Sequence, residues 1–138
     1  MTRRDWLLLA IGDRLQPIQI QKTLFKFSKE AGAPLGEVYE FTPYNWGPCS
    51  FEIYDDLQQL REDGLIESVP TSRGWNVYRT TRSGIEVGNR IRKKADSRLL
   101  GQMVSIREWV VARSFPDLLK DVYRDYPDYA TQSLFTER

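Results

Sequence analysis

The stretch "YNWGPCSFEIYDDLQQLREDGLI" (residues 44–66) decides the fold of this 138-residue chain. It opens with aromatic residues and a Gly-Pro turn, and Ser50 then offers a helix N-cap. Apolar residues follow at helical spacing: Ile53, Tyr54, Leu57 and Leu60. The pattern predicts a helix that ends at Gly64. The loop before it, residues 33–49, is rich in proline and glycine, so we expect structure there but little helix.

The sequence before this loop predicts two helices. Asp5 can cap a short first helix that ends near Gly12. The segment "QPIQIQKTLFKFSKEAG" (residues 16–32) has Pro17 in a first-turn position and Gly32 just past its end. Its apolar residues form an inner stripe of Ile20, Leu24, Phe27 and Ala31. Its basic residues form a second stripe, which we expect on the opposite side: Lys22, Lys26 and Lys29.

The sequence after Gly64 predicts a β-hairpin and three further helices. Two short β-prone runs, residues 65–69 and 75–80, flank the turn "PTSRG". Thr81 or Ser83 can cap the helix that follows. The segment "SRLLGQMVSIREWVVA" (residues 97–112) repeats its apolar residues at helical spacing. A last helix begins after Ser114 and extends to about Tyr126.

This order of elements favours a mainly α (α+β) fold. Helix, helix, loop, helix and hairpin is the order of a winged helix-turn-helix with a two-stranded wing. We expect residues 1–95 to form this domain and residues 96–138 to add a C-terminal helical extension within the same compact unit. An unrelated α+β fold is the alternative.

The composition narrows the possible functions. The chain has no histidine and one cysteine, Cys49, so His-dependent triads, ordinary zinc sites and internal disulfides are excluded. A net charge of +1 gives no global basicity, so nucleic-acid binding would depend on a local patch. No run approaches membrane-spanning length. We expect a cytoplasmic, non-enzymatic protein without metal or cofactor, in which Cys49 is a small buried residue.

Two resemblances extend this interpretation. Residues 50–84 look like many winged-helix regulators, with "LREDGLI" ending a helix and "YRTTRSG" at the joint between hairpin and helix. Residues 18–66 resemble the Panacea-type antitoxin domain in "IQKTLFKFS", "YNWGPCS", "IYDDLQQL" and "DGLI". Trp46 and Cys49 depart from that domain's pattern. This second resemblance implies direct contact with a toxin, with transcriptional or adaptor roles in some members.

The leading hypothesis from sequence is a DNA-binding transcriptional regulator or antitoxin-like protein. Seven cations against the single acid Glu86 lie between residues 70 and 95, and Arg73 stands at the hairpin tip beside Trp75. A basic wing of this kind can follow the phosphate backbone of duplex DNA. Scattered solubilising charge is the alternative. The predicted DNA contacts are Asn45, Trp46, Ser50, Arg73, Trp75, Arg79, Arg82, Lys22 and Lys26.

The rival hypothesis is a protein-binding module, an antitoxin or adaptor that neutralises or recruits a partner such as a toxin. The predicted helix over residues 51–63 carries five carboxylates, which would oppose DNA phosphates. In the preceding loop we expect Phe41 and Tyr44 to cover the core and Trp46 to be exposed for recognition. Under the leading hypothesis, the C-terminal helices could supply the two-fold homodimer interface that regulators of palindromic sites require, through Trp109, Val110, Val122 and Tyr126.

Overall fold

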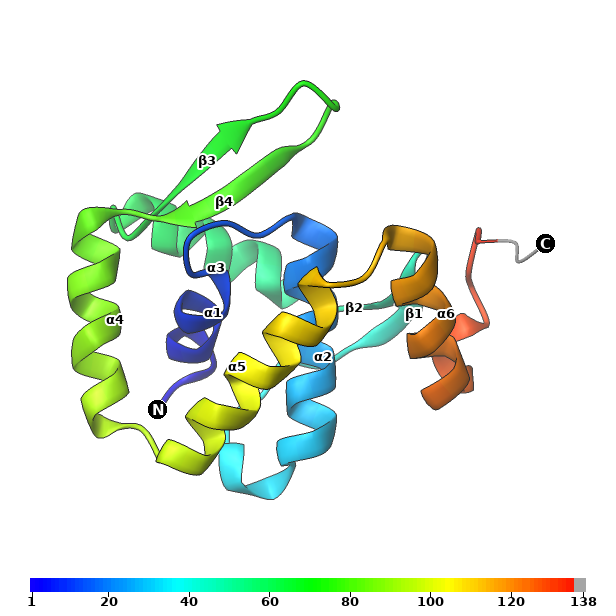
Figure 1. The fold of residues 1–138 in the computed structure, drawn as a ribbon, viewed down its shortest axis with the longest axis horizontal. Coiled ribbons are helices and arrows are strands. Elements are labelled where there is room, and N and C mark those ends of the chain that lie inside the picture. Colours follow the sequence, from blue (N-terminus) through cyan, green and yellow to red (C-terminus); the bar gives the residue numbers. More distant parts are fainter. Residues whose placement is uncertain (136–138) are drawn as a thin grey trace.

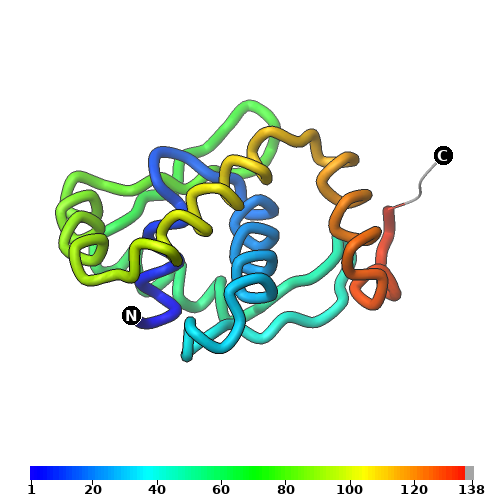
Figure 2. The backbone as a smooth tube through the Cα atoms, turned by 60° about the horizontal axis from the view of Figure 1, so that its bottom comes forward, coloured from blue at the N-terminus to red at the C-terminus, as the bar shows by residue number. Residues whose placement is uncertain are grey.

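Helix α2 (Pro17–Ala31) lies at the centre of the fold in the computed structural model, which describes residues 1–135 (Figure 1). Helix α1 (Arg3–Ile11) packs against one side of it, and α3 (Phe51–Glu62) packs against α1. Helix α5 (Ser97–Val111) lies along another side (Figures 1 and 2). Side chains are therefore buried around most of the α2 circumference, which is unusual for a helix that also carries three lysines.

The helices agree closely with the sequence-based expectations. Helix α2 begins at Pro17, and the next residue after it is Gly32, as predicted. Thr81 caps α4 (Arg82–Lys94), and Ser114 caps α6 (Phe115–Asp125). The N-cap of α1 is Thr2, whose side chain accepts a hydrogen bond from the Asp5 backbone N–H. The prediction that Asp5 caps this helix is wrong, because Asp5 is the third residue of the helix. Short 3-10 helices cover Ala33–Leu35 and Pro127–Ala130.

The strands form two separate antiparallel pairs. The predicted hairpin pairs β3 (Ile66–Pro70) with β4 (Asn76–Thr80). Its free end projects from the helices in Figure 1. The other edge of β4 meets Leu15, which forms an isolated antiparallel bridge with Tyr78. A second hairpin, β1 (Thr42–Tyr44) and β2 (Gly47–Cys49), lies within the predicted loop.

One hydrophobic core joins the N-terminal and C-terminal parts. Trp6, Ile20 and Ile53 belong to the same buried cluster as side chains from the last helices: Met103, Ile106, Val110, Leu118 and Val122. The architecture is mixed α and β, as the sequence predicted. No helix within residues 1–135 is both long and apolar enough to cross a lipid bilayer.

Candidate functional site

The lysines of α2 do not form an exposed basic face. Lys22 is 2% exposed, and its Nζ donates a hydrogen bond to the Pro48 carbonyl at 2.9 Å. Burial lowers the pKa of this ammonium to about 8. Lys26 is largely covered, with its Nζ 2.9 Å from Glu30 and 4.4 Å from the ring centroid of Trp109. The prediction that Lys22 contacts DNA is wrong, because the side chain is buried against the β1–β2 hairpin. Lys26 remains partly exposed, with Glu30 and the Trp109 ring as its neighbours.

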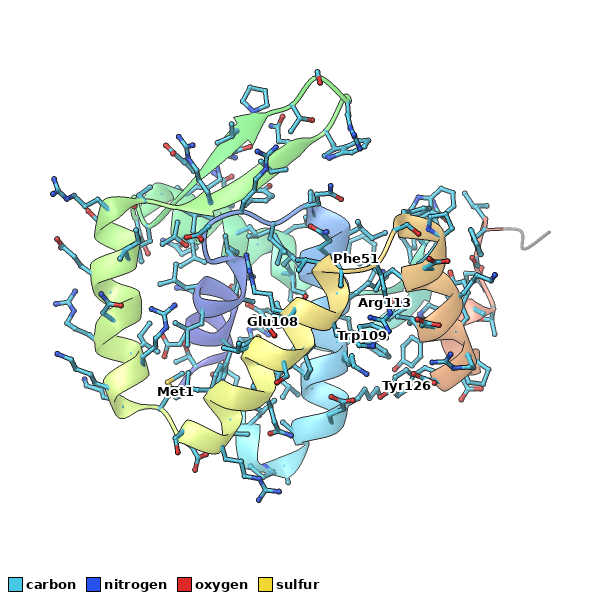
Figure 3. The ribbon with its side chains drawn as sticks, viewed as in Figure 1. Met1, Phe51, Glu108, Trp109, Arg113 and Tyr126 are labelled. Atoms are coloured by element: carbon cyan, nitrogen blue, oxygen red, sulfur yellow. The ribbon has the colours of Figure 1, made fainter. Side chains whose placement is uncertain are left out.

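The residues predicted for a dimer interface hold the C-terminal helices on α2. Val110 and Val122 are buried in the chain's own core, so their assignment to an interface between copies is wrong. Trp109 lies between two cations, Lys26 and Arg113, and the Arg113 guanidinium is 3.7 Å from its ring centroid (Figure 3). Tyr126 packs edge-on against Phe25, with 4.9 Å between the ring centroids.

Ser50 is also unavailable to a ligand. It stands at the N-cap of α3 but is 1% exposed, and its Oγ has no hydrogen-bond partner. The Gln21 side chain instead binds the Ser50 backbone twice. Gln21 Oε1 accepts from the Ser50 N–H at 2.8 Å, and Gln21 Nε2 donates to the Ser50 C=O at 3.0 Å. The predicted DNA contact at Ser50 is therefore wrong, and this buried link fixes where α3 begins.

Two of the α3 carboxylates bind α1. Asp56 is buried and accepts hydrogen bonds from the Tyr39 hydroxyl at 2.7 Å and from Arg3 Nε at 3.2 Å. Burial, with the bond to Asp56, raises the pKa of Tyr39. Glu52 accepts from the backbone amide of Glu40 and pairs with Arg3, and both contacts lower the pKa of Glu52. The remaining acids of this segment are exposed: Asp55, Glu62 and Asp63.

The seven cations between residues 70 and 95 divide into three groups. Arg79 on β4 pairs with Glu67 on β3. Arg73 at the hairpin tip is exposed and has no ion pair within residues 1–135. The cations of α4 are exposed and likewise unpaired with any acid in that range: Arg82, Arg90, Arg92, Lys93 and Lys94. The basic character of this region therefore resides mainly in α4.

Six large aromatic side chains are exposed in two groups, which we together call the aromatic surface: Tyr44, Phe51 and Tyr54 in one, and Trp46, Trp75 and Phe115 in the other. Within it, Phe51 contacts Tyr44 edge-on, with 5.2 Å between the ring centroids, and lies beside Tyr54 at 6.3 Å. Trp46, in the β1–β2 turn, contacts Phe115 at the start of α6 at 5.5 Å. The expectation that Trp46 is exposed is confirmed, whereas Tyr44 is 45% exposed and does not cover the core.

A groove of about 630 Å³ lies within this aromatic surface. Its walls come from four parts of the chain that are distant in sequence: the start of α2, the β1–β2 turn, the β3–β4 tip and the start of α6. The lining residues are Gln16, Pro17, Ile18, Trp46, Arg73, Trp75 and Phe115. The groove thus joins three exposed aromatic rings to one unpaired guanidinium.

Phe51 and Phe115 were not predicted as surface residues, and the prediction that Tyr54 belongs to the buried stripe of its helix is wrong, because its side chain is 46% exposed. Phe51 and Tyr54 are three positions apart on α3, off the buried stripe of Ile53 and Leu57, and that spacing could have indicated an exposed aromatic pair. Phe115 had no such signal, because only the tertiary fold brings α6 to the β1–β2 turn.

Burial raises the pKa of the Cys49 thiol, and this cysteine is free and buried, as predicted. Within residues 1–135 no group of three or more Cys, Asp or Glu side chains is placed to hold a metal ion. Neither the protein-family models nor the curated proteins contain a match to this chain.

Proposed function

We propose that this chain is a non-enzymatic, winged-helix-type protein that binds a partner protein through its aromatic surface. The observation that carries the proposal is the exposure of six aromatic rings, drawn from four separate segments and arranged in two groups of three. Exposed apolar patches on soluble domains commonly mark interaction sites, and Trp and Tyr are enriched among residues that dominate binding energy. A role as an antitoxin or adaptor is one form of this function.

The winged-helix assignment is supported by the bridge between Leu15 and Tyr78. The segment between α1 and α2 pairs with β4, and β4 pairs with β3, so β4 lies between two partners. A short strand after the first helix that joins the wing is a feature of winged-helix domains, and the element order agrees with it. In such a domain α3 occupies the position of the recognition helix.

The surface of α3 favours a protein partner over DNA. Its exposed acids Asp55, Glu62 and Asp63 would lie near phosphates if the helix entered a groove, and each would oppose binding. Of the α2 lysines that could have compensated, Lys22 is buried and Lys26 is paired with Glu30. Exposed Phe51 and Tyr54 on the same helix are suited to an apolar contact.

Photocrosslinking tests this proposal. p-Benzoylphenylalanine replaces Phe51 or Phe115 in the full chain, in the cells that make the protein, and adducts are identified by mass spectrometry. We expect discrete protein adducts from both positions. The matched control is the same substitution at Glu86, exposed on α4 and outside the aromatic surface. Equal adducts from position 86, or none from 51 and 115, would refute the function.

Duplex DNA is the second candidate partner, favoured by the five exposed α4 cations against the single acid Glu86. Fluorescence anisotropy with a random duplex at low and moderate salt tests it. DNA binding through α4 would weaken steeply with salt. Arg90→Glu with Lys93→Glu would weaken it further and make it less dependent on salt, because each lost phosphate contact reduces the salt slope by about 0.9. If the protein-binding proposal is correct, the duplex does not bind tightly even at low salt.

A further inference from the structure

The outer edge of β4 is paired over only part of its length. Tyr78 exchanges two backbone hydrogen bonds with Leu15, each 2.9 Å long, and the Thr80 N–H donates to the Gly12 carbonyl at 3.1 Å. Because the backbone groups of a strand alternate between its two edges, Asn76 presents its N–H and C=O on this same edge. No backbone bond on that edge is formed by Asn76 within residues 1–135.

The pairing stops because of Pro17. Continuing the register from Leu15 and Tyr78 places Pro17 opposite Asn76. Proline has no N–H to donate, and Pro17 begins α2, so the chain turns away from the strand there. The open edge at Asn76 therefore lies beside the groove, whose walls include Pro17 and Ile18 on one side and Arg73 and Trp75 on the other.

We propose that the groove binds an extended segment of the partner protein as an added strand beside Asn76. The segment would carry an aromatic or proline side chain against Trp46, Trp75 and Phe115, and a carboxylate on Arg73. This proposal rests on the protein-binding function above and specifies where and how part of the partner binds.

Three features of the groove select this occupant. An exposed strand edge with unpaired backbone groups accepts another extended chain, which supplies the missing hydrogen bonds. Aromatic walls favour flat apolar side chains, for which ring–ring and ring–proline contacts are available. Arg73 lacks an acidic partner in the described part of the chain, and a guanidinium pairs bidentately with carboxylate or phosphate, of which an unmodified protein segment supplies the carboxylate of Asp or Glu.

Peptide selection tests the proposal. A phage library of random twelve-residue peptides is selected on the full chain, and the enriched sequences are synthesised and their affinities measured by anisotropy. We expect enrichment of peptides that combine an aromatic residue or proline with Asp or Glu. Binding of such a peptide should slow hydrogen exchange of the Asn76 amide at least tenfold, as measured by NMR.

Charge reversal identifies the groove as the site. Arg73→Glu should weaken the acidic peptides at least tenfold, and selection on that variant should enrich Lys or Arg in place of Asp or Glu. The matched control is Arg79→Glu, which reverses a cation of the same hairpin that pairs with Glu67 and does not line the groove. Its peptide affinities should stay within twofold of those of the unmodified chain.

Several results would overturn the proposal. These are the absence of enriched peptides, unchanged affinity with Arg73→Glu, unchanged exchange at Asn76, and a single-stranded oligonucleotide that displaces the peptide by binding the groove itself. Dimerisation of the chain that Arg73→Glu abolishes would assign the groove to a second copy. Loss of peptide binding with Phe51→Ala but not with Arg73→Glu would leave the protein-binding function standing and refute only the assignment of the site to the groove. Crosslinked adducts at position 51 in the absence of any bound peptide would lead to the same conclusion.

Discussion

Lys22 is the residue whose burial most clearly links protonation to stability. The lowered pKa, about 8 against an ordinary 10.5, follows from desolvation of the ammonium. Between these two pH values the unfolded chain binds more protons than the folded chain, so the contribution of Lys22 makes stability rise with pH. Below pH 8 Lys22 is charged in both states, and its burial then costs about 3 kcal/mol relative to an ordinary lysine.

We predict that Lys22→Met stabilises the protein by about 2 kcal/mol at pH 7, because removal of the charge outweighs the lost hydrogen bond to Pro48. The variant should also lose the rise in stability between pH 8 and 10. Urea unfolding at a series of pH values measures both effects. Lys29→Met, which removes an exposed lysine of the same helix, should retain the original slope. If the stability of Lys22→Met depended on pH in the same way as that of the parent protein, this account would be contradicted.

The start of α3 gives a second prediction at the residue scale. Because the Ser50 hydroxyl has no partner, Ser50→Ala should change stability by less than about 0.5 kcal/mol, whereas a capping serine contributes about 1 kcal/mol. Gln21→Met should cost about 1–3 kcal/mol, since it leaves the buried N–H of Ser50 unpaired, while the Ser50 C=O keeps the hydrogen bond from the Ile53 N–H. Denaturant unfolding measures the stability of both variants. A larger loss of stability for Ser50→Ala than for Gln21→Met would show that the Ser50 hydroxyl, and not Gln21, holds the start of α3.

At the scale of elements, local patterns predicted the helices well and failed where distant packing decides the structure. Pro17 and Gly32 bound α2 because proline and glycine act on their own backbone. The burial of Lys22 depends on α5 and the β1–β2 hairpin, and no spacing within α2 encodes their position. The groove was missed for the same reason. Trp46, Trp75 and Arg73 were singled out separately, but their convergence with Phe115 is a tertiary property.

Two helical glycines, Gly84 and Gly101, allow a paired test of how closely α4 packs against the segment before β3. A Cβ on Gly84 in α4 would lie 1.9 Å from the Leu65 carbonyl oxygen, whereas one on Gly101 in α5 would meet no atom within 4 Å. We predict that Gly84→Ala costs more than about 2 kcal/mol, because α4 must move away from the hairpin. Gly101→Ala should stabilise by about 0.5–1 kcal/mol through helix propensity. Thermal unfolding tests the pair, and equal effects would show that α4 is not held closely.

At the scale of the whole molecule, the C-terminal helices complete the core. Helix α5 contributes Met103, Ile106 and Val110 to the buried cluster. The Arg107 guanidinium donates hydrogen bonds of 2.7 and 3.0 Å to the Ala10 and Ile11 carbonyls at the end of α1. Such contacts satisfy helix-terminal carbonyls that have no partner within the helix. Residues 96–135 are therefore part of what stabilises the N-terminal elements.

We predict that a fragment of residues 1–95 retains helix but loses fixed packing, because it exposes Phe25 and the buried Lys22 to water. Far-UV circular dichroism should show helix, while near-UV signals and NMR dispersion disappear and a hydrophobic dye binds. Adding residues 96–138 as a separate peptide should restore the dispersed spectrum, which distinguishes missing contacts from irreversible misfolding. A fragment that unfolds cooperatively with dispersed resonances would show instead that the first 95 residues hold a sufficient core of their own.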